Sequence, residues 1–426
     1  MAGPESHTRQ AHLVGSENSG IGPTSQQERI EALDVLRGFA LLGILTMNMG
    51  GFSMPSAAYM DPTAWGEFSG LNLGVWVTTH LFADLKFMAI FSILFGAGLV
   101  LMSDRRSARG EKTAGLHLRR MFWLLVFGLL HAHLLWSGDV LVWYALCGAV
   151  LFPLRNAKTG TLISLALVSW SIGSLILISG ALSFQEWPSE DAAQLIASLK
   201  PHPEVLLAEV NHYRGGWLEQ MHARIPSAIE SETTTFASWA AWRVSGLMLL
   251  GMALFKLGIL TGQAESRTYR RMIIAGLVIG LPLIGLGLQK NFAAAWAAPD
   301  FLFINSLFNY WGSIPVALGW VGVVMLTLKS GLALDITSRL SAVGRMAFSN
   351  YILQTVMCTT IFYGHGLGLF GSIDRSGQLL VVFAVWGFQL WLSPLWLSAF
   401  RFGPLEWLWR SLVYMKVQPM RNPSVP

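Results

Sequence analysis

The chain has 426 residues, of which 53% are hydrophobic and only 12% are charged, and its mean hydropathy is +0.50. This composition excludes an ordinary soluble domain and indicates a polytopic membrane protein. The net charge of +5 does not indicate nucleic-acid binding, because cytoplasmic loops of membrane proteins are basic anyway. Cys147 and Cys358 both lie in apolar runs, which favours buried free thiols over a disulfide.

Residues 1–28 are polar and lack the apolar core of a signal peptide, so we expect a disordered cytoplasmic tail. Ten apolar runs follow, and they predict an all-α bundle of about ten transmembrane helices at 33–52, 73–102, 121–136, 139–154, 160–183, 238–260, 271–289, 300–328, 342–363 and 377–401. The predicted organisation is a first five-helix half at 29–183, an extracytoplasmic region at 184–237, a second half at 238–410 and a cytoplasmic tail at 411–426.

Basic residues predict how the bundle is oriented, because Lys and Arg collect in cytoplasmic loops. The loop at 103–120 carries Arg105, Arg106, Arg109, Lys112, Arg119 and Arg120. With the N-terminus inside, this loop and the later basic groups all fall on the cytoplasmic side, whereas 184–237 is acidic. We therefore expect both termini in the cytoplasm and a multi-pass protein of the bacterial cytoplasmic (inner) membrane.

The first predicted span carries polar residues at both ends. Asp34 and Arg37 lie three apart at its cytoplasmic end and share a helix face. Asn48 lies on that same face about 16 Å further along, near the outer end. This helix therefore has a charged pair on one side of the membrane and an amide on the other.

Ionisable residues in two further spans are predicted at the same outer depth. His80 and Asp84 are four apart and share a face of the second span, while His131 and His133 lie in the third span. Asp139 follows at the outer hairpin. Because ionisable groups are costly in a membrane, they usually face a cavity or a partner. A carboxylate-oriented imidazole would suit general-base chemistry, and the alternative is a hydrogen-bonded pair that holds two helices in register.

The other polar patterns are less specific. His131 and His133 are two apart and cannot both face one site, and no HxxxH spacing supports a metal centre, so we expect no metal. Asn350 and Gln354 share a face and either bind a ligand or join helices. No phosphate-binding GxxxxGK[ST] loop, dinucleotide GxGxxG or GxSxG elbow occurs, so nucleotide hydrolysis and serine-hydrolase chemistry have little support.

Several motifs resemble those of the YeiB-like bacterial membrane proteins. They are RIEALDVLRGFALLGI (29–44), KFMAIFSILFGAG (86–98), RRMFWLLVFGLLHAHLLWSGDVLVWYAL (119–146), GRMAFSNYILQ (344–354) and GPLEWLWR (403–410). By resemblance, this family belongs with transmembrane acyltransferases such as the lysosomal heparan-alpha-glucosaminide N-acetyltransferase. Those enzymes take an acyl group from cytoplasmic acyl-CoA and deliver it to a sugar on the far side.

The resemblance transfers only in part to individual residues. It places Asn48 on a catalytic asparagine and Asp84 on a matching aspartate, but the position of the catalytic histidine is occupied by Tyr59. A second family of sugar O-acyltransferases also opens with LDxLRG, and there Arg37 matches an arginine while Asn48 stands at a histidine position. Both departures remove the expected base, so His80 or His131 would have to supply it.

These observations lead to one functional hypothesis, a membrane acyltransferase. His131 or His80 would be the general base, Asp84 or Asp139 would orient it, and Asn48 would stabilise the oxyanion. No cofactor is expected to be tightly bound, and acyl-CoA, as co-substrate, would dock among basic residues, namely Arg37, Arg119, Arg120 and Arg345.

The expected partners are membrane lipids and a glycan or lipid acceptor. We expect no binding to nucleic acid, and a homo-oligomer is possible on the sequence alone. The alternative function is a secondary transporter or exporter of a small solute, because the ten spans divide five and five around the 184–237 loop. A non-enzymatic membrane partner is the third alternative. The acceptor and the acyl chain do not follow from the sequence.

Overall fold

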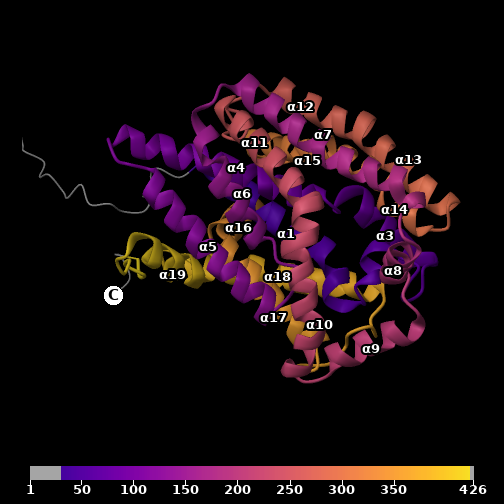
Figure 1. Ribbon diagram of the computed structural model, residues 1–426. Helices are drawn as coiled ribbons and strands as arrows, with labels where there is room; N and C mark the ends of the chain where they lie inside the picture. Colours follow the sequence, from indigo (N-terminus) through magenta and orange to yellow (C-terminus); the bar gives the residue numbers. More distant parts are fainter. Residues whose placement is uncertain (1–29, 423–426) are drawn as a thin grey trace, which may run out of the picture.

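The computed structural model describes residues 30–422, which form a bundle of helices (Figure 1). The predicted tail at 1–28 lies outside these residues. In chain order the α-helices are α1 Glu31–Ser53, α2 Ala57–Met60, α3 Gly70–Phe82, α4 Lys86–Ala108, α5 Ala114–Leu134, α6 Leu141–Leu151, α7 Thr159–Ser183, α8 Ser189–Leu199, α9 Pro203–Arg214, α10 Trp217–Glu230, α11 Ala241–Lys256, α12 Ser266–Ala275, α13 Leu281–Ala293, α14 Ala298–Leu302, α15 Ser306–Ser330, α16 Leu334–Arg345, α17 Ala347–Phe362, α18 Arg375–Ala399 and α19 Pro404–Tyr414. Short 3₁₀ segments occur at Phe152–Asn156 and Phe184–Glu186, and π-helical turns at Ser231–Ala240 and Gly276–Gly280 connect α10 to α11 and α12 to α13.

The predicted helical membrane architecture is confirmed, although the number of crossings stays a prediction. Within the described residues, seven helical stretches are long and apolar enough to cross a membrane, namely Glu31–Ser53, Gly70–Ala108, Thr159–Glu186, Trp217–Lys256, Ser266–Ala293, Ala298–Ser330 and Arg375–Ala399. The three other predicted spans, at 121–136, 139–154 and 342–363, are helical as α5, α6 and α17 but do not meet the same criterion of length and hydropathy.

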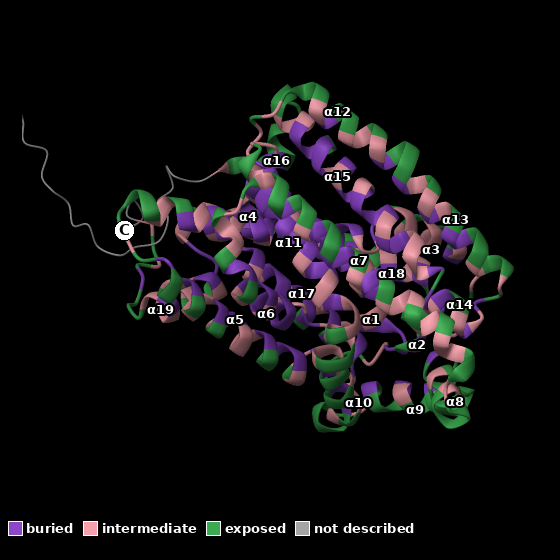
Figure 2. Cartoon of the chain, turned by 45° about the horizontal axis from the view of Figure 1, so that its top comes forward, coloured by how far each residue is buried: buried purple, intermediate pink, exposed green. Residues whose placement is uncertain are grey.

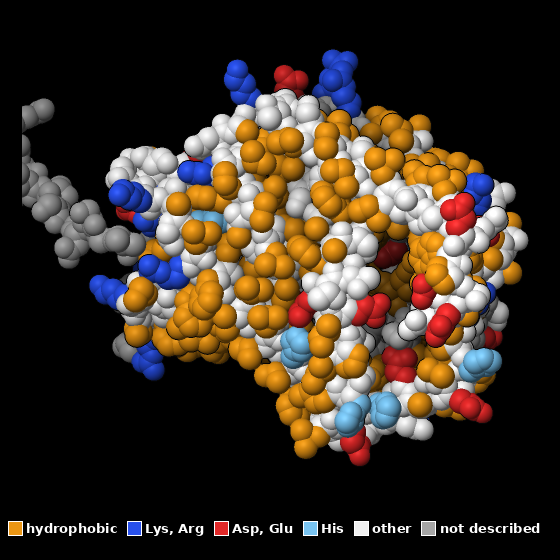
Figure 3. Space-filling view, viewed as in Figure 1, with side chains coloured by type: hydrophobic (Ala, Val, Ile, Leu, Met, Phe, Trp, Pro, Cys, Tyr) orange, Lys and Arg blue, Asp and Glu red, His pale blue; other side chains and the backbone are white. Residues whose placement is uncertain are grey.

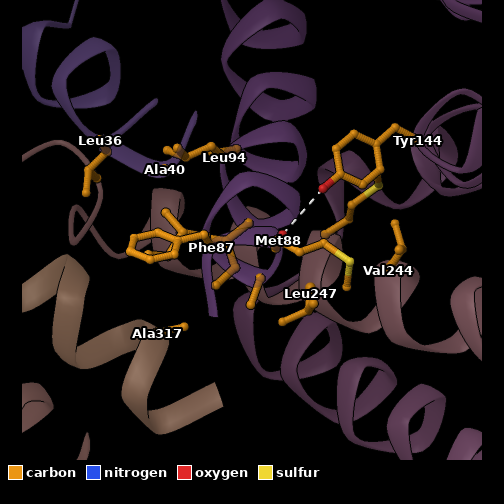
Figure 4. Packing of buried hydrophobic residues seen from close by; sticks show 14 of the residues in the cluster. Leu36, Ala40, Phe87, Met88, Leu94, Tyr144, Val244, Leu247 and Ala317 are labelled. Carbon is orange, nitrogen blue, oxygen red and sulfur yellow. Dashed lines mark hydrogen bonds between the residues drawn. The ribbon is translucent and has the colours of Figure 1, made fainter. Parts of the chain in front are cut away.

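The interior of the bundle is packed around α4. Met88 of α4 contacts a cluster that includes Val244 and Leu247 of α11 and Ala317 of α15 (Figure 4). The Tyr144 hydroxyl of α6 donates a hydrogen bond to the Met88 carbonyl at 3.3 Å. Figure 2 shows that burial is concentrated in these inner helices. The outer helices α7, α12 and α13 expose apolar side chains, such as Leu175, Ile274 and Leu286, as lipid-facing helices do.

Glycines let inner helices approach one another closely. A side chain at Gly96 of α4 would collide with the Met248 carbonyl of α11, and one at Gly251 of α11 would collide with the Ile93 carbonyl of α4. Gly98, by contrast, has no neighbour within 4 Å. Close packing therefore explains Gly96, but it does not explain Gly98.

The helices α1 and α16 meet in the same way near the end of the bundle that carries most Lys and Arg side chains. Gly38 of α1 lies against the Leu340 carbonyl, and Gly344 of α16 lies against the Asp34 carbonyl. This contact fixes the start of α1, with its Asp34 and Arg37, against the end of α16. We call this end of the molecule the basic end.

The region at 184–237 lies at the opposite end, which we call the acidic end. It is helical in the structure, as α8, α9 and α10, and α10 continues through the π-helical turn into α11. Figure 3 shows the separation of charge, with Lys and Arg gathered at the upper and left edges and Asp and Glu at the lower right. Both cysteines, Cys147 and Cys358, are buried and free, as predicted.

Candidate functional site

A break in the second predicted span creates a polar site that is partly accessible from outside. The sequence predicts one helix at 73–102, but α3 ends at Phe82 and α4 begins at Lys86. Leu85 adopts a left-handed conformation with φ of 63°, which non-glycine residues rarely adopt. The turn places Asp84 beside the last turn of α3, and its amide donates to the Thr79 carbonyl at 2.9 Å.

The turn supports a closed ring of hydrogen bonds. His80 Nδ1 lies 3.3 Å from Asp84 Oδ2, and the Asn309 amide of α15 donates to the same oxygen at 2.8 Å. Lys86 Nζ donates to Asn309 Oδ1 at 2.8 Å and returns to the His80 carbonyl at 2.5 Å. Two segments more than 200 residues apart thus hold the imidazole and the carboxylate together.

This ring has a buried side and an accessible side. Lys86 is fully buried and Asn309 is 7% exposed, whereas the side chains of His80 and Asp84 are 17% and 25% exposed. His80 Nε2 makes no hydrogen bond to any described residue, and it is not among the buried polar atoms that lack a partner. Figure 3 shows a hollow with an acidic side chain at its floor, at the place where Figure 1 has α3 and α8.

Buried positive charge lies behind the carboxylate. Arg243 of α11 is fully buried and hydrogen-bonds to the Tyr310 carbonyl and, at 2.6 Å, to the Ser313 hydroxyl. It attracts Asp84 electrostatically and repels Lys86. The buried guanidinium of Arg243 would stabilise negative charge that develops nearby during a reaction.

Tyr59 brings a phenol to the same site. The residue lies in α2, next to Gly50 of α1, and interacts electrostatically with Asp84. Desolvation at the hydroxyl, followed by the Asp84 carboxylate, raises the pKa of Tyr59 above its usual range, although the residue as a whole is 43% exposed. The phenol therefore stays protonated and can donate a hydrogen bond. Asn48, two residues before Gly50, is half-buried, and its amide makes no hydrogen bond within the described part of the chain.

The second predicted histidine forms a separate and closed cluster. His131 Nδ1 lies 2.8 Å from Asp139 Oδ1, and His131 Nε2 lies 2.9 Å from the Thr355 hydroxyl of α17. The other Asp139 oxygen accepts the Val142 amide at 2.8 Å. His131, Asp139 and Thr355 are each no more than 3% exposed, so this chain of hydrogen bonds joins α5, α6 and α17 but is sealed from solvent.

The structure therefore divides the predicted outer cluster into two pairs, His80 with Asp84 and His131 with Asp139. His133 points elsewhere and pairs with Glu232 at 3.2 Å, in agreement with the expectation that His131 and His133 face different partners. Among the described residues, no group of three or more His, Cys, Asp or Glu side chains is arranged to hold a metal ion.

Amide side chains between α17 and α18 join helices. The Asn350 amide of α17 donates to the Ser393 hydroxyl at 2.9 Å, and the Gln354 amide donates to Gln389 Oε1 at 2.9 Å. Asn350, Gln354 and Gln389 are at most 2% exposed. Of the two sequence-based interpretations, the contacts favour helix joining over ligand binding.

The four predicted donor-binding arginines lie at the basic end but do not form one site. Arg37 pairs with Asp34 at 2.7 Å and approaches the Gly344 carbonyl at 3.5 Å. Arg119 donates to the Val413 carbonyl at 2.9 Å, and Arg120 stacks over the Trp409 ring at 4.9 Å, so both hold α19. Arg345 lines a cavity between α16 and α18.

Three participants were not predicted from the sequence, namely Asn309, Arg243 and Thr355. In the sequence, Asn309 and Arg243 each stand as a polar residue within an apolar run. Such a residue is costly in a membrane unless it has a partner, and this could have pointed to both. Thr355 gives no such signal, because a threonine can bond to its own helix backbone.

Comparisons with known proteins cover nearly the whole chain. Residues 254–416 match the family model described as a protein of unknown function (DUF418). The chain is 32% identical to the uncharacterized protein YxaH of Bacillus subtilis, over 94% of this chain and 98% of that protein. It is 33% identical to the uncharacterized protein YeiB of Escherichia coli, over 92% of this chain and 98% of that protein.

Proposed function

This chain belongs to the family of YeiB-like membrane proteins, and we propose that it is an acyltransferase of the bacterial inner membrane. It moves an acyl group from cytoplasmic acyl-CoA to a glycan or lipid acceptor on the extracytoplasmic side. The basic end faces the cytoplasm, in accordance with the charge rule for membrane proteins, and the acidic end carries the acceptor site.

The accessible His80–Asp84 pair is the observation that carries this proposal. A general base must come within hydrogen-bond reach of the proton that it removes. The His80 imidazole meets this condition because Asp84 holds its Nδ1 while Nε2 stays accessible. The His131 imidazole has both nitrogens bonded within the protein and is sealed, so of the two candidate bases we assign His80.

The chemistry is a transfer between a thioester and a hydroxyl or amine. The acceptor attacks the thioester carbonyl while its proton passes to His80 Nε2. The carbon–sulfur bond then breaks, and the thiolate of CoA leaves with the proton that His80 returns. Negative charge on the carbonyl oxygen is stabilised by the positive charge of Arg243, and Tyr59 and Asn48 serve as hydrogen-bond donors to it.

Transfer of label from acyl-CoA tests the proposal. Purified protein, mixed with labelled acetyl-CoA and with glycan or lipid acceptors, is expected to yield labelled acceptor. His80→Ala is expected to reduce the rate by at least about 100-fold, which is typical of losing a general base.

His133→Ala is the matched control, because it removes a histidine that is also partly exposed but lies outside the site. The proposal is wrong if His80→Ala keeps the wild-type rate. Solute flux through proteoliposomes without any acyl-CoA would favour the transporter instead.

A further inference from the structure

The imidazole of His80 is stacked on an aromatic ring of its own helix. Trp76 lies four residues before His80 in α3, so the two side chains share a face of the helix. Their ring centroids are 5.0 Å apart and their planes are inclined by only 12°, which is an offset stack. The imidazole of His131 is held differently, since its aromatic neighbours Trp136 and Tyr351 are inclined to it by 70° and 53°.

This stack restrains the imidazole in a way that its hydrogen bond does not. The contact from His80 Nδ1 to Asp84 Oδ2 is 3.3 Å long, and the outer torsion of a histidine side chain is broad. One long hydrogen bond therefore leaves the plane of the ring weakly defined. Contact with the flat face of Trp76 fixes this plane, and with it the direction in which Nε2 points.

Trp76 is held in turn by aromatic side chains from two other segments. Phe68, just before α3, meets it in a T-shaped contact at 5.3 Å, and Trp296, in the turn between α13 and α14, meets it at 6.0 Å. The Phe68 ring is covered by the Arg375 guanidinium, 5.4 Å from its centroid. We call Phe68, Trp76 and Trp296 the aromatic wall.

The turn that carries Trp296 has an unusual backbone. Ala295 and Trp296 have φ of 47° and 51°, in the left-handed region that non-glycine residues rarely adopt. Lys200, at the end of α8, holds the turn by donating to the Ala295 carbonyl at 3.2 Å, and its Nζ lies 3.7 Å from Asp61. Strained residues persist only where their surroundings hold them, so the fold maintains this strain while it places Trp296 against Trp76.

An aromatic belt at the membrane boundary is the simpler account of tryptophans at the outer end of a span. Belt residues lie at the surface of the protein, where they contact lipid headgroups and water. Trp296 is only 3% exposed, and Trp76 is half-buried with its ring against His80. These two tryptophans therefore face the protein, and the side chain that they support is the histidine with an accessible Nε2.

We propose that Trp76 is a positioning residue for His80, and that the aromatic wall fixes the plane of the imidazole so that Nε2 points toward the acceptor. The use of that nitrogen as a base rests on the proposed function, whereas the fixed orientation of the ring does not. The wall also gives α8 a role, because Lys200 of the extracytoplasmic region holds the turn at Trp296.

Nuclear magnetic resonance tests the orientation without any reaction. The full-length protein in nanodiscs carries histidine labelled with ¹³C at Cε1, and the His80 signal is the one that is absent from His80→Ala. The ring current of a stacked indole displaces this signal, so we expect Trp76→Leu to change its chemical shift and to increase the motion of the ring. Trp76→Phe keeps a flat face and is expected to lie between Trp76→Leu and the wild type.

The transfer assay tests the consequence. Trp76→Leu is expected to lower kcat at least about tenfold and to leave the KM for the acceptor nearly unchanged, because a small misplacement of a catalytic group is costly. Trp76→Phe is expected to recover most of the rate. Trp391→Leu is the matched control, because it makes the same substitution at a tryptophan that is 56% exposed on α18. It is expected to change neither kcat nor the His80 signal.

The possible outcomes separate the orientation from the catalytic assignment. A His80 signal with equal shift and motion in Trp76→Leu and wild type overturns the proposal. So does a kcat that is unchanged in Trp76→Leu while His80→Ala abolishes transfer. If Trp76→Leu disturbs the other histidine signals through misfolding, Trp76→Phe decides by the same two criteria. A wild-type protein with the expected restrained ring but without any acyl transfer would refute the proposed function alone.

Discussion

Replacement of His131 by alanine separates a structural histidine from a catalytic one. The imidazole makes two hydrogen bonds, at 2.8 Å to Asp139 and at 2.9 Å to Thr355, and its side chain is 1% exposed. In His131→Ala the Asp139 carboxylate would keep only the Val142 amide as a partner. Loss of one member of a buried, hydrogen-bonded pair costs about 3–5 kcal/mol.

We therefore expect His131→Ala to lower the free energy of unfolding by about 3–5 kcal/mol, as measured by denaturant titration in mixed micelles. His133→Ala is the control, because its bond to Glu232 joins side chains that are 29% and 17% exposed, and such pairs contribute at most about 1 kcal/mol. Equal stability of the two variants would refute the assignment of the His131–Asp139–Thr355 chain as a sealed structural link.

Three further changes have defined outcomes. Lys86→Met leaves Asn309 Oδ1 and the His80 carbonyl without their hydrogen-bond donor. We therefore expect slower acyl transfer in the labelled assay and a loss of about 1–3 kcal/mol in the free energy of unfolding. Unchanged transfer would exclude a role for the hydrogen-bonded ring in positioning His80. Gly344→Ala would push α16 away from the Asp34 carbonyl of α1 and is expected to lower the free energy of unfolding by about 1–3 kcal/mol. Gly98→Ala is expected to leave stability unchanged, because the space around Gly98 is open. Similar losses of stability for the two variants in denaturant titrations would contradict this account of the packing. Burial raises the pKa of Glu406, whose oxygens accept the Phe348 and Ser349 amides at the start of α17, so the folded state binds a proton that the unfolded state releases. Stability should therefore fall as the pH rises from the ordinary glutamate pKa through the raised one, and Glu406→Gln should remove this slope; an identical pH profile in both proteins would count against it.

The sequence predicted the parts of this fold that depend on local pattern. Apolar runs indicate helices wherever they are long, and the spacing of four residues puts His80 and Asp84 on one face. The grouping of basic residues predicts which ends of the helices lie together, and the structure gathers them at one end. The two free cysteines follow from their apolar surroundings.

Contacts between residues that are far apart in the sequence could not be predicted from local patterns. Asn309 contacts Asp84 across 225 positions, and Thr355 contacts His131 across 224. A single sequence contains no signal for these distances, because tertiary packing alone decides which helices are neighbours. The break at Leu85 is similar, since its left-handed backbone is imposed by the fold and not by a glycine or proline. The sequence left open whether Asp84 or Asp139 orients the catalytic imidazole, and the structure pairs His80 with Asp84 and His131 with Asp139.

The sidedness of acyl transfer tests the central claim most directly. Protein reconstituted in sealed proteoliposomes would receive labelled acyl-CoA only at the face that carries the basic end and acceptor only at the opposite face. The account predicts labelled acceptor in the second compartment, in wild type and in His133→Ala but not in His80→Ala. Transfer that requires donor and acceptor in the same compartment, or that proceeds equally in His80→Ala, would contradict it.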